Sequence, residues 1–341
     1  MKRAKPYASS TDVARLAGVS QSAVSRTYKQ GASVSPETRR KVLEAAEQLG
    51  YRPSFIPSIM LNHRSRLVAM VVGGLYNPFY SGVLEYFSEC LQAEGWRPLL
   101  VHAPSGHTLD DIVPMLAGYR VDAVVSALAV LSPRAAEQLS ELRVPVITFN
   151  ARYSGEWVHS ISCDNFGGAR VMAQHMIACG ARSFAYIAGP ADSQANIERR
   201  RGFLTGVSEA GLQPPREFSG NFRYEGGRAA IDQLVSETPG RLPDAIFGAN
   251  DLLALGAMDT LRKRFGKRVP QDVMVGGYDD IPEANWESYR LTTLLHDGRQ
   301  MVERGIEILR SEEAGHGEAF NSSVIVHSPL VLRESTTLGA A

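Results

Sequence analysis

The 341-residue chain is too long for a single hydrophobic core, so we expect two or three folding units. Its 44% hydrophobic and 21% charged residues are typical of a globular protein and exclude a disordered or fibrous one. The formal net charge of +0 conceals a division, because residues 1–66 carry 12 Lys/Arg against 4 Asp/Glu and the other 275 carry 24 against 32. A basic head on an acidic body predicts a head that meets a polyanion.

The cysteines and the absence of long apolar segments bear on the cell compartment. Cys90, Cys163 and Cys179 are an odd number without a CxxC pair, which argues against a disulfide framework and a thiolate metal site. The N-terminus lacks the apolar run of a signal peptide, and no segment reaches the roughly 18–20 apolar residues of a membrane span. We therefore expect a cytoplasmic protein.

The first 53 residues contain the signals of three short helices. Ser10 or Thr11 can cap the first helix, and Gly18 ends it. Its apolar face is expected to consist of Val13, Leu16 and Ala17. Ser20 caps a second helix, QSAVSRTY, after a turn of about three residues, which is a helix-turn-helix arrangement.

A third helix is predicted to start at Ser35, because Pro36 at the first helical position gives up only an N–H that has no partner within the helix. Its apolar stripe has helical spacing and consists of Val42, Ala45, Ala46 and Leu49. The stripe predicts that this helix packs on the other two, and Gly50 ends it.

The second helix carries a polar outer face. That face contains Gln21, Ser22, Ser25 and Arg26, while Val24 and Tyr28 are expected to point inward. In a recognition helix, residues near the N-terminus read bases in the major groove. Arg26 suits guanine and Gln21 suits adenine, whereas the DNA backbone is the expected partner of Ser22, Ser25, Lys29 and Tyr51. The alternative is a small three-helix domain whose polar face is merely solvated.

The segment TDVARLAGVSQSAVSRTYKQGASVSPETRRKVLEAAEQLGYRP resembles, without a gap, the DNA-binding headpiece of the lac repressor (LacI/GalR) family of bacterial transcription regulators. In that family the two residues that open the recognition helix select the operator, which implies this role for Gln21 and Ser22. The resemblance also implies that Arg26 contacts a base. Lys29 stands where the family commonly has asparagine.

Residues 54–66, SFIPSIMLNHRSR, link the head to the body. In the resembled family this hinge forms a short helix on operator DNA, pairs with its dimer mate in the minor groove and wedges a leucine into the central base step, which kinks the duplex. Met60 stands at the leucine position, and Pro57 stands where a small residue is usual. If Ser54 caps the helix, Pro57 falls in the first turn, where its missing N–H costs little.

From Leu67 onward, short apolar runs alternate with longer amphipathic stretches, which predicts parallel α/β units. We expect two such sheets, with a changeover near Asp164 and another near RLTTLLHD. The family resemblance extends over the body to about Arg333 and implies the type I periplasmic-binding-protein fold. The expected domains are a headpiece (1–53), a hinge (54–66) and an effector-binding and dimerisation body (67–341), with subdomains of roughly 67–164 plus 296–325 and 165–295 plus 326–341.

Ligands of open α/β sheets bind beyond the carboxyl ends of the strands. Polar residues follow four predicted strands, namely Asn150, Asp164, Asn250-Asp251 and Asp279-Asp280, and Phe79 with Tyr80 follows the first strand. Position by position, the resemblance implies that Arg199 grips effector hydroxyls or a carboxylate, that Phe222 stacks on the ligand and that Asp279 accepts hydrogen bonds from it. The alternative for each acid or amide is a strand-end cap or turn, and Asp164 equally suits the changeover between sheets.

Motifs of catalysis are missing from the sequence. It contains no GxGxxG, GxxxxGK[ST], GxSxG or HExxH pattern, and its eight histidines are scattered. We expect neither catalysis, nor a metal, nor a cofactor. A solute-binding protein of the same body fold and an α/β enzyme with a fused regulatory head are the rival hypotheses, of which the first needs a signal peptide and the second predicts turnover.

The sequence therefore predicts a cytoplasmic, nucleoid-associated homodimer that represses transcription at a pseudo-palindromic operator. A small effector, a sugar or sugar acid with a purine as the alternative, is expected to bind the body and release the DNA. The helix PFYSGVLEYFSECLQ is a candidate dimer surface through Leu84 and Phe87, and a core position for these two residues is the alternative.

Overall fold

The computed structural model describes residues 8–29, 31–52, 65–73, 75–103, 109–127, 133–141, 143–150, 157–313 and 323–337. The chain divides into two compact units, Met1–Ser65 and Arg66–Ala341, which we call the head and the body. Within the described ranges, no helix is long and apolar enough to cross a membrane.

The head is a bundle of three helices, α1 (Ser10–Ala17), α2 (Gln21–Tyr28) and α3 (Pro36–Gln48). Each starts at a serine whose side chain accepts a hydrogen bond from the backbone three residues on: Ser9, Ser20 and Ser35. Gly18 ends α1 in the left-handed conformation, as the sequence predicted. The small core contains Val13, Ala14, Val24, Val42, Ala45 and Ala46.

Four expectations for the head were wrong. The cap of α1 is Ser9, not Ser10 or Thr11, because Ser9 and Asp12 form a capping box. Leu16 is 51% exposed, and Ala14 takes the core position. Leu49, expected on the apolar stripe of α3, is exposed because it is the C-cap residue beyond the buried turn of Ala45 and Ala46. Tyr28 is also exposed, because Thr27 is the residue of that turn that faces the core, and its hydroxyl is satisfied by the carbonyl of Ala23.

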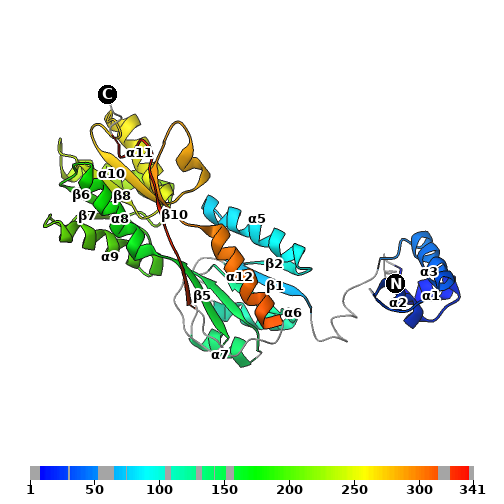
Figure 1. The fold of residues 1–341 in the computed structure, drawn as a ribbon. Helices are drawn as coiled ribbons and strands as arrows, with labels where there is room; N and C mark the ends of the chain where they lie inside the picture. Colours follow the sequence, from blue (N-terminus) through cyan, green and yellow to red (C-terminus); the bar gives the residue numbers. More distant parts are fainter. Residues whose placement is uncertain are drawn as a thin grey trace, which may run out of the picture. The chain divides into compact units, whose positions relative to one another are not determined.

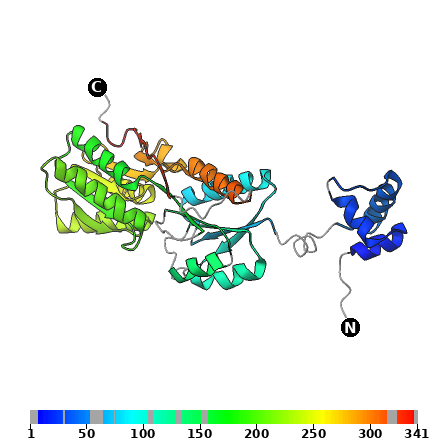
Figure 2. The same ribbon diagram turned by 60° about the horizontal axis from the view of Figure 1, so that its bottom comes forward.

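The body consists of two lobes, each a sheet with helices on both faces (Figures 1 and 2). The first lobe has the strand order β11-β5-β4-β3-β1-β2, all parallel. Its strands are β1 (Leu67–Val72), β2 (Arg97–His102), β3 (Ala123–Ser126), β4 (Val146–Phe149), β5 (Val158–Cys163) and β11 (Ser323–Val326). Its helices are α5 (Pro78–Ala93), α6 (Val113–Tyr119), α7 (Pro133–Glu141) and α12 (Gly298–Glu313), with a short 3-10 turn, η1 (Leu109–Asp111). Separate apolar clusters fill the two faces of this sheet.

The second lobe has the strand order β12-β10-β9-β8-β6-β7, parallel except for β12. Its strands are β6 (Phe184–Ala188), β7 (Arg216–Ser219), β8 (Ala245–Gly248), β9 (Met274–Asp279), β10 (Thr292–Leu295) and β12 (Leu330–Val331). Its helices are α8 (Asn165–Ala178), α9 (Gln194–Glu209), α10 (Tyr224–Glu237) and α11 (Asp251–Phe265), with a 3-10 turn, η2 (Pro282–Asn285). The chain passes between lobes after β5, after β10 and between β11 and β12.

The helix that was a candidate dimer surface, α5, packs against α12. Phe87 is fully buried in the core of the first lobe, which excludes it as a contact with a second protomer. Leu84 lies at the edge of the same cluster and is partly buried. Phe87 is therefore a core residue, which was the alternative to a dimer contact.

Candidate nucleic-acid interface and ligand cavity

The outer face of α2 is polar and open. Gln21, Ser22, Ser25 and Arg26 are all exposed, while Ala23 and Val24 lie beneath them in the core. Among the described residues, no acidic side chain pairs with Arg26 or Lys29, so both cations are available to a polyanion. The side-chain amide of Gln21 donates to the hydroxyl of Ser10 at 2.9 Å, which ties the start of α2 to α1.

Two contacts hold the C-terminal end of α2 against α3 and the segment that follows it. Arg39 donates to the carbonyl of Thr27 at 3.0 Å. The ring of Tyr51 lies edge-on to that of Tyr28, with 6.0 Å between centroids. Tyr51 is thus half-buried beside the C-terminal end of α2, and Met60, the expected minor-groove wedge, lies outside the described residues.

A cavity of about 100 Å³ lies at the carboxyl ends of the strands of the body. All seven residues that the sequence proposed as ligand contacts line it: Phe79, Tyr80, Asn150, Arg199, Phe222, Asn250 and Asp279. They come from both lobes, so both lobes of the body must fold before the cavity exists. Asp164 does not line it, because its carboxylate caps α8 by accepting the N–H of Gly167.

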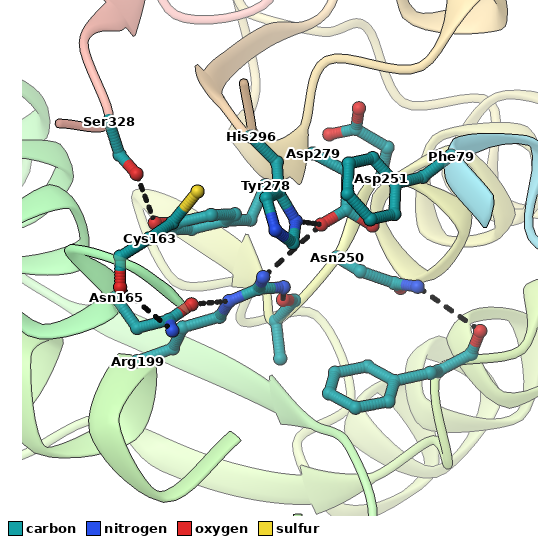
Figure 3. A network of polar contacts seen from close by, with 12 residues as sticks. Phe79, Cys163, Asn165, Arg199, Asn250, Asp251, Tyr278, Asp279, His296 and Ser328 are labelled. Atoms are coloured by element: carbon teal, nitrogen blue, oxygen red, sulfur yellow. Dashed lines mark hydrogen bonds and ion pairs between the residues drawn. The ribbon is translucent and has the colours of Figure 1, made fainter. Parts of the chain in front are cut away.

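Arg199 is the central cation of the cavity (Figure 3). It is 3% exposed, and it donates to Asn165 Oδ1 at 2.8 Å and to the carbonyl of Ala249 at 2.7 Å. Its Nη2 lies 3.2 Å from Asp279 Oδ1, and its guanidinium carbon is 3.6 Å from the ring centroid of Tyr278. Burial lowers the pKa of the guanidinium, but the Asp279 carboxylate together with Tyr278, Tyr186 and Cys163 leaves that pKa raised.

The Asp279 carboxylate is held from three sides. Besides Arg199, it accepts from Asn77 Nδ2 at 3.1 Å, and His296 Nδ1 lies 3.3 Å from its Oδ1. Burial raises the pKa of Asp279, yet Arg199, His296 and Asn77 together bring it below its usual value. Burial likewise opposes the charged form of His296, but Cys163 and Asp279 raise the pKa of that imidazole to about 9. Two cations therefore share one buried carboxylate at neutral pH.

The remaining walls combine aromatic rings with amide groups. Asn150 Oδ1 is buried without a hydrogen-bond partner in the part of the chain that the structure describes, so it is an acceptor left for a ligand. Burial raises the pKa of Tyr80, beside Asn150, to about 12. Asn250 caps α11 through Leu253 and donates to the carbonyl of Phe222 at 3.2 Å.

A second acid, Asp251, lies behind the cavity. Burial, and then the charges of Asp279 and Asp280, raise its pKa to about 8. It is hydrogen-bonded to Thr293 and accepts the N–H of Ile281 at 2.9 Å, so it holds the turn after β9 against α11. Asp251 therefore stabilises the fold and does not line the cavity.

Among the residues of the cavity wall that sequence reasoning missed, four carry polar side chains. These are Tyr76, Asn77, Ser193 and His296. The strand-end argument would have found His296, which directly follows β10. Asn77 and Ser193 cap α5 and α9, a signal that indicates a helix start and says nothing of a ligand.

The described residues contain no group of three or more His, Cys, Asp or Glu side chains arranged to hold a metal ion. The body thus presents a polar and aromatic cavity in a two-lobed α/β fold, and the head presents a basic helix-turn-helix.

Comparison with known proteins agrees with both halves. The model of bacterial regulatory proteins of the lacI family matches residues 11–54, and the model of the periplasmic binding protein-like domain matches residues 173–336. The HTH-type transcriptional regulator CelR of Thermobifida fusca is 33% identical over 314 residues, which cover 88% of this chain and 91% of CelR. The chain belongs to the LacI family.

Solved structures of the LacI family share the whole architecture. A complex of the transcriptional regulator CelR with cellobiose is 31% identical, with a TM-score of 0.70 over 96% of this chain and 99% of that one. A lac repressor dimer bound to operator and the anti-inducer ONPF is 26% identical, with a TM-score of 0.86 over 97% and 100%. This LacI-family protein is a DNA-binding transcriptional regulator, and its relatives are named as regulators.

Proposed function

We propose that the protein is a repressor that binds a pseudo-palindromic operator as a homodimer and releases it when a small effector occupies the cavity. The exposed face of α2 and its C-cap residue Lys29 support the first part, because Arg26 and Lys29 have no acidic partner among the described residues. The proposed DNA contacts are Gln21, Ser22, Ser25, Arg26, Lys29, Tyr51 and Met60.

One observation carries the effector assignment: the seven residues that the sequence predicted as effector contacts all line the same cavity. Asn150 Oδ1 offers a free acceptor, Arg199 offers donors, and Phe79 and Phe222 offer apolar faces. This mixture suits a sugar or sugar acid, whose hydroxyls need donors and acceptors and whose ring faces are apolar. A purine is the alternative, because aromatic rings also stack on bases.

The coupling of the two sites follows from linkage. An effector changes operator affinity only if it binds the DNA-competent and DNA-free arrangements unequally, typically by about 1–3 kcal/mol. The cavity is bounded by both lobes, so a ligand that binds there is sensitive to their relative arrangement. We propose binding without turnover, in the cytoplasm and on the nucleoid.

Selection of the purified full-length protein on a randomised DNA library tests this function. We expect enrichment of a palindrome that a chain lacking residues 1–66 does not enrich. The selected operator then allows sugars, sugar acids and purines to be screened for release, with Asn150→Ala as the cavity variant. If nothing is enriched at low salt, with or without these compounds, the repressor assignment fails. If a compound is converted to product, the binding-only assignment fails.

A further inference from the structure

The end of the loop between β1 and α5, together with the first turn of α5, contacts the other side of the cavity. Asn77 reaches Asp279 of β9 with a hydrogen bond of 3.1 Å. Two residues on, the ring of Phe79 stacks on that of His296 at a centroid distance of 3.8 Å. Asn77, Asp279 and His296 are buried, so these contacts lie inside the closed molecule.

Tyr76, which directly precedes Asn77 in the loop, makes the most exposed of these contacts. The guanidinium carbon of Arg223 lies 4.2 Å from the centroid of the Tyr76 ring, a cation–π geometry. Tyr76 lines the cavity and is also 50% exposed, which locates it at the mouth. Arg223 is exposed as well and comes from the second lobe, at the N-terminus of α10. The pair therefore joins the two lobes where the cavity meets solvent.

The backbone before Arg223 is held in an uncommon conformation. Asn221 and Phe222 have φ values of 54° and 58°, the left-handed region that few residues other than glycine adopt. The N–H groups of Gly220 and Asn221 both donate to the carbonyl of Ala188, and Arg223 N–H donates to Gly220, which fixes the turn. Such conformations persist only where surrounding contacts determine them, and they cluster at ligand clamps.

The turn has a clear consequence for the two side chains that follow it. The ring of Phe222 lies against Gly189, where a Cβ would come within 2.4 Å of the ring, and it lines the cavity. The next side chain, Arg223, lies over Tyr76 instead. One constrained turn thus supplies both a wall of the cavity and one half of the contact at its mouth.

We propose that Tyr76 and Arg223 form a latch over the mouth of the cavity, which must separate before an effector enters or leaves. The identity of the molecule that passes rests on the proposed function, whereas opening is a property of the chain itself. The two deeper contacts are buried, so the exposed pair is the first to part. An exposed cation–π pair is weak, so its loss raises the opening equilibrium about two- to fivefold.

The buried thiol of Cys163 can report opening without any ligand. Cys163 ends β5 with no exposed surface, and its sulfur is close enough to His296 of the cavity wall to raise the pKa of that imidazole. Cys163 itself does not line the cavity, so dithiobis(nitrobenzoate) reaches it only when the wall formed by His296 moves away from it. In a Cys90→Ser/Cys179→Ser background, the labelling rate of Cys163 therefore measures how often this wall opens. The background also removes the two partly exposed thiols from the signal.

Arg223→Ala and Tyr76→Ala are each expected to raise the labelling rate about two- to fivefold. The double variant should label no faster than the faster single variant, because both changes remove one contact. Tyr76→Phe keeps the ring and should label at the parental rate. Arg201→Ala is the matched control, since Arg201 is also exposed and lies 4.8 Å from the ring of Phe166, which does not line the cavity.

The latch is overturned if Arg223→Ala labels no faster than Arg201→Ala, or if the two single effects multiply in the double variant. It is also overturned if each labelling rate rises only in proportion to global unfolding, measured in parallel by urea titration. These results are independent of the DNA selection. If the labelling test overturns the latch but the DNA selection enriches an operator, the repressor assignment still holds. If the labelling test supports the latch but no operator is enriched, only the repressor assignment fails.

Discussion

The head and the body expose their functional residues in opposite ways. The proposed DNA contacts on α2 lie within one eight-residue helix, and all are exposed. The proposed effector contacts come from loops, helices and strand ends of both lobes, and the central pair of Arg199 and Asp279 is nearly inaccessible. Substitutions on α2 should therefore change binding without changing stability, whereas substitutions in the cavity should change both.

The largest effect should follow from breaking the buried ion pair of the cavity. Arg199→Ala leaves Asp279 buried without its main counter-charge and should lower the free energy of unfolding of the body by about 3–5 kcal/mol. Urea unfolding followed by fluorescence measures this. The control is Arg200→Ala, which removes an exposed pair with Glu217 and should cost at most about 1 kcal/mol. Equal losses in the two variants would contradict the comparison.

The pH dependence of the stability of the body tests the second buried cation of the cavity, His296. The pKa of His296 is raised to about 9 in the folded protein from 6.5, so its stabilising contribution is complete below pH 6.5 and is lost as the pH rises through 9. The shift corresponds to about 3 kcal/mol at most. Wild type should therefore be more stable than His296→Gln at pH 6, and the two should converge by pH 10. Asp251 titrates in both proteins, so its contribution largely cancels in the difference.

A stability difference between wild type and His296→Gln that stays constant from pH 6 to pH 10 would show that the imidazole is not charged in the folded protein. In that case the carboxylate of Asp279 would be balanced by Arg199 alone. The urea titration described for Arg199 serves for this measurement, repeated at five pH values.

Arg26 provides the corresponding test of the head. Arg26→Ala should weaken binding to the selected operator by about 1–3 kcal/mol, or roughly 5- to 150-fold, if it reads a guanine. Its stability should change by less than about 0.5 kcal/mol, because the side chain is exposed. Fluorescence anisotropy at fixed salt measures the affinity, with Arg40→Ala on α3 as the control. Equal losses for both variants would indicate general electrostatics instead of base recognition.

The sequence predicted helix starts better than it predicted which side chains are buried. Ser20, Ser35 and Gly18 were placed correctly because capping depends on a few neighbouring residues. The inward side of an eight-residue helix is set by how it docks, so Leu16 and Tyr28 were misplaced. Local pattern cannot decide such contacts.

In the body, the other strands with apolar runs were found, whereas the segment of β10 was predicted only as a changeover and β7, β11 and β12 were not predicted. β7, β11 and β12 are edge strands of four or fewer residues, and each is paired on one side only. The carboxyl-end rule located the acids and amides of the cavity because it needs only strand positions. The contact between Tyr76 and Arg223 joins residues far apart in the sequence, and only the folded chain reveals it.

The smallest effect tests whether head and body are energetically separate. Ser35 caps α3 by accepting the N–H of Thr38 at 3.2 Å, and Ser35→Ala should lower the stability of the head by about 1 kcal/mol. The body has its own cores, so calorimetry should show a shifted head transition beside an unchanged body transition. Ser25→Ala, at an exposed position inside α2, should leave both transitions in place, since alanine is the better helix former.

If the body transition moves with that of the head in Ser35→Ala, the two units unfold as one. The stability of the cavity would then depend on the head, and effects of cavity variants on operator binding could no longer be assigned to the cavity alone.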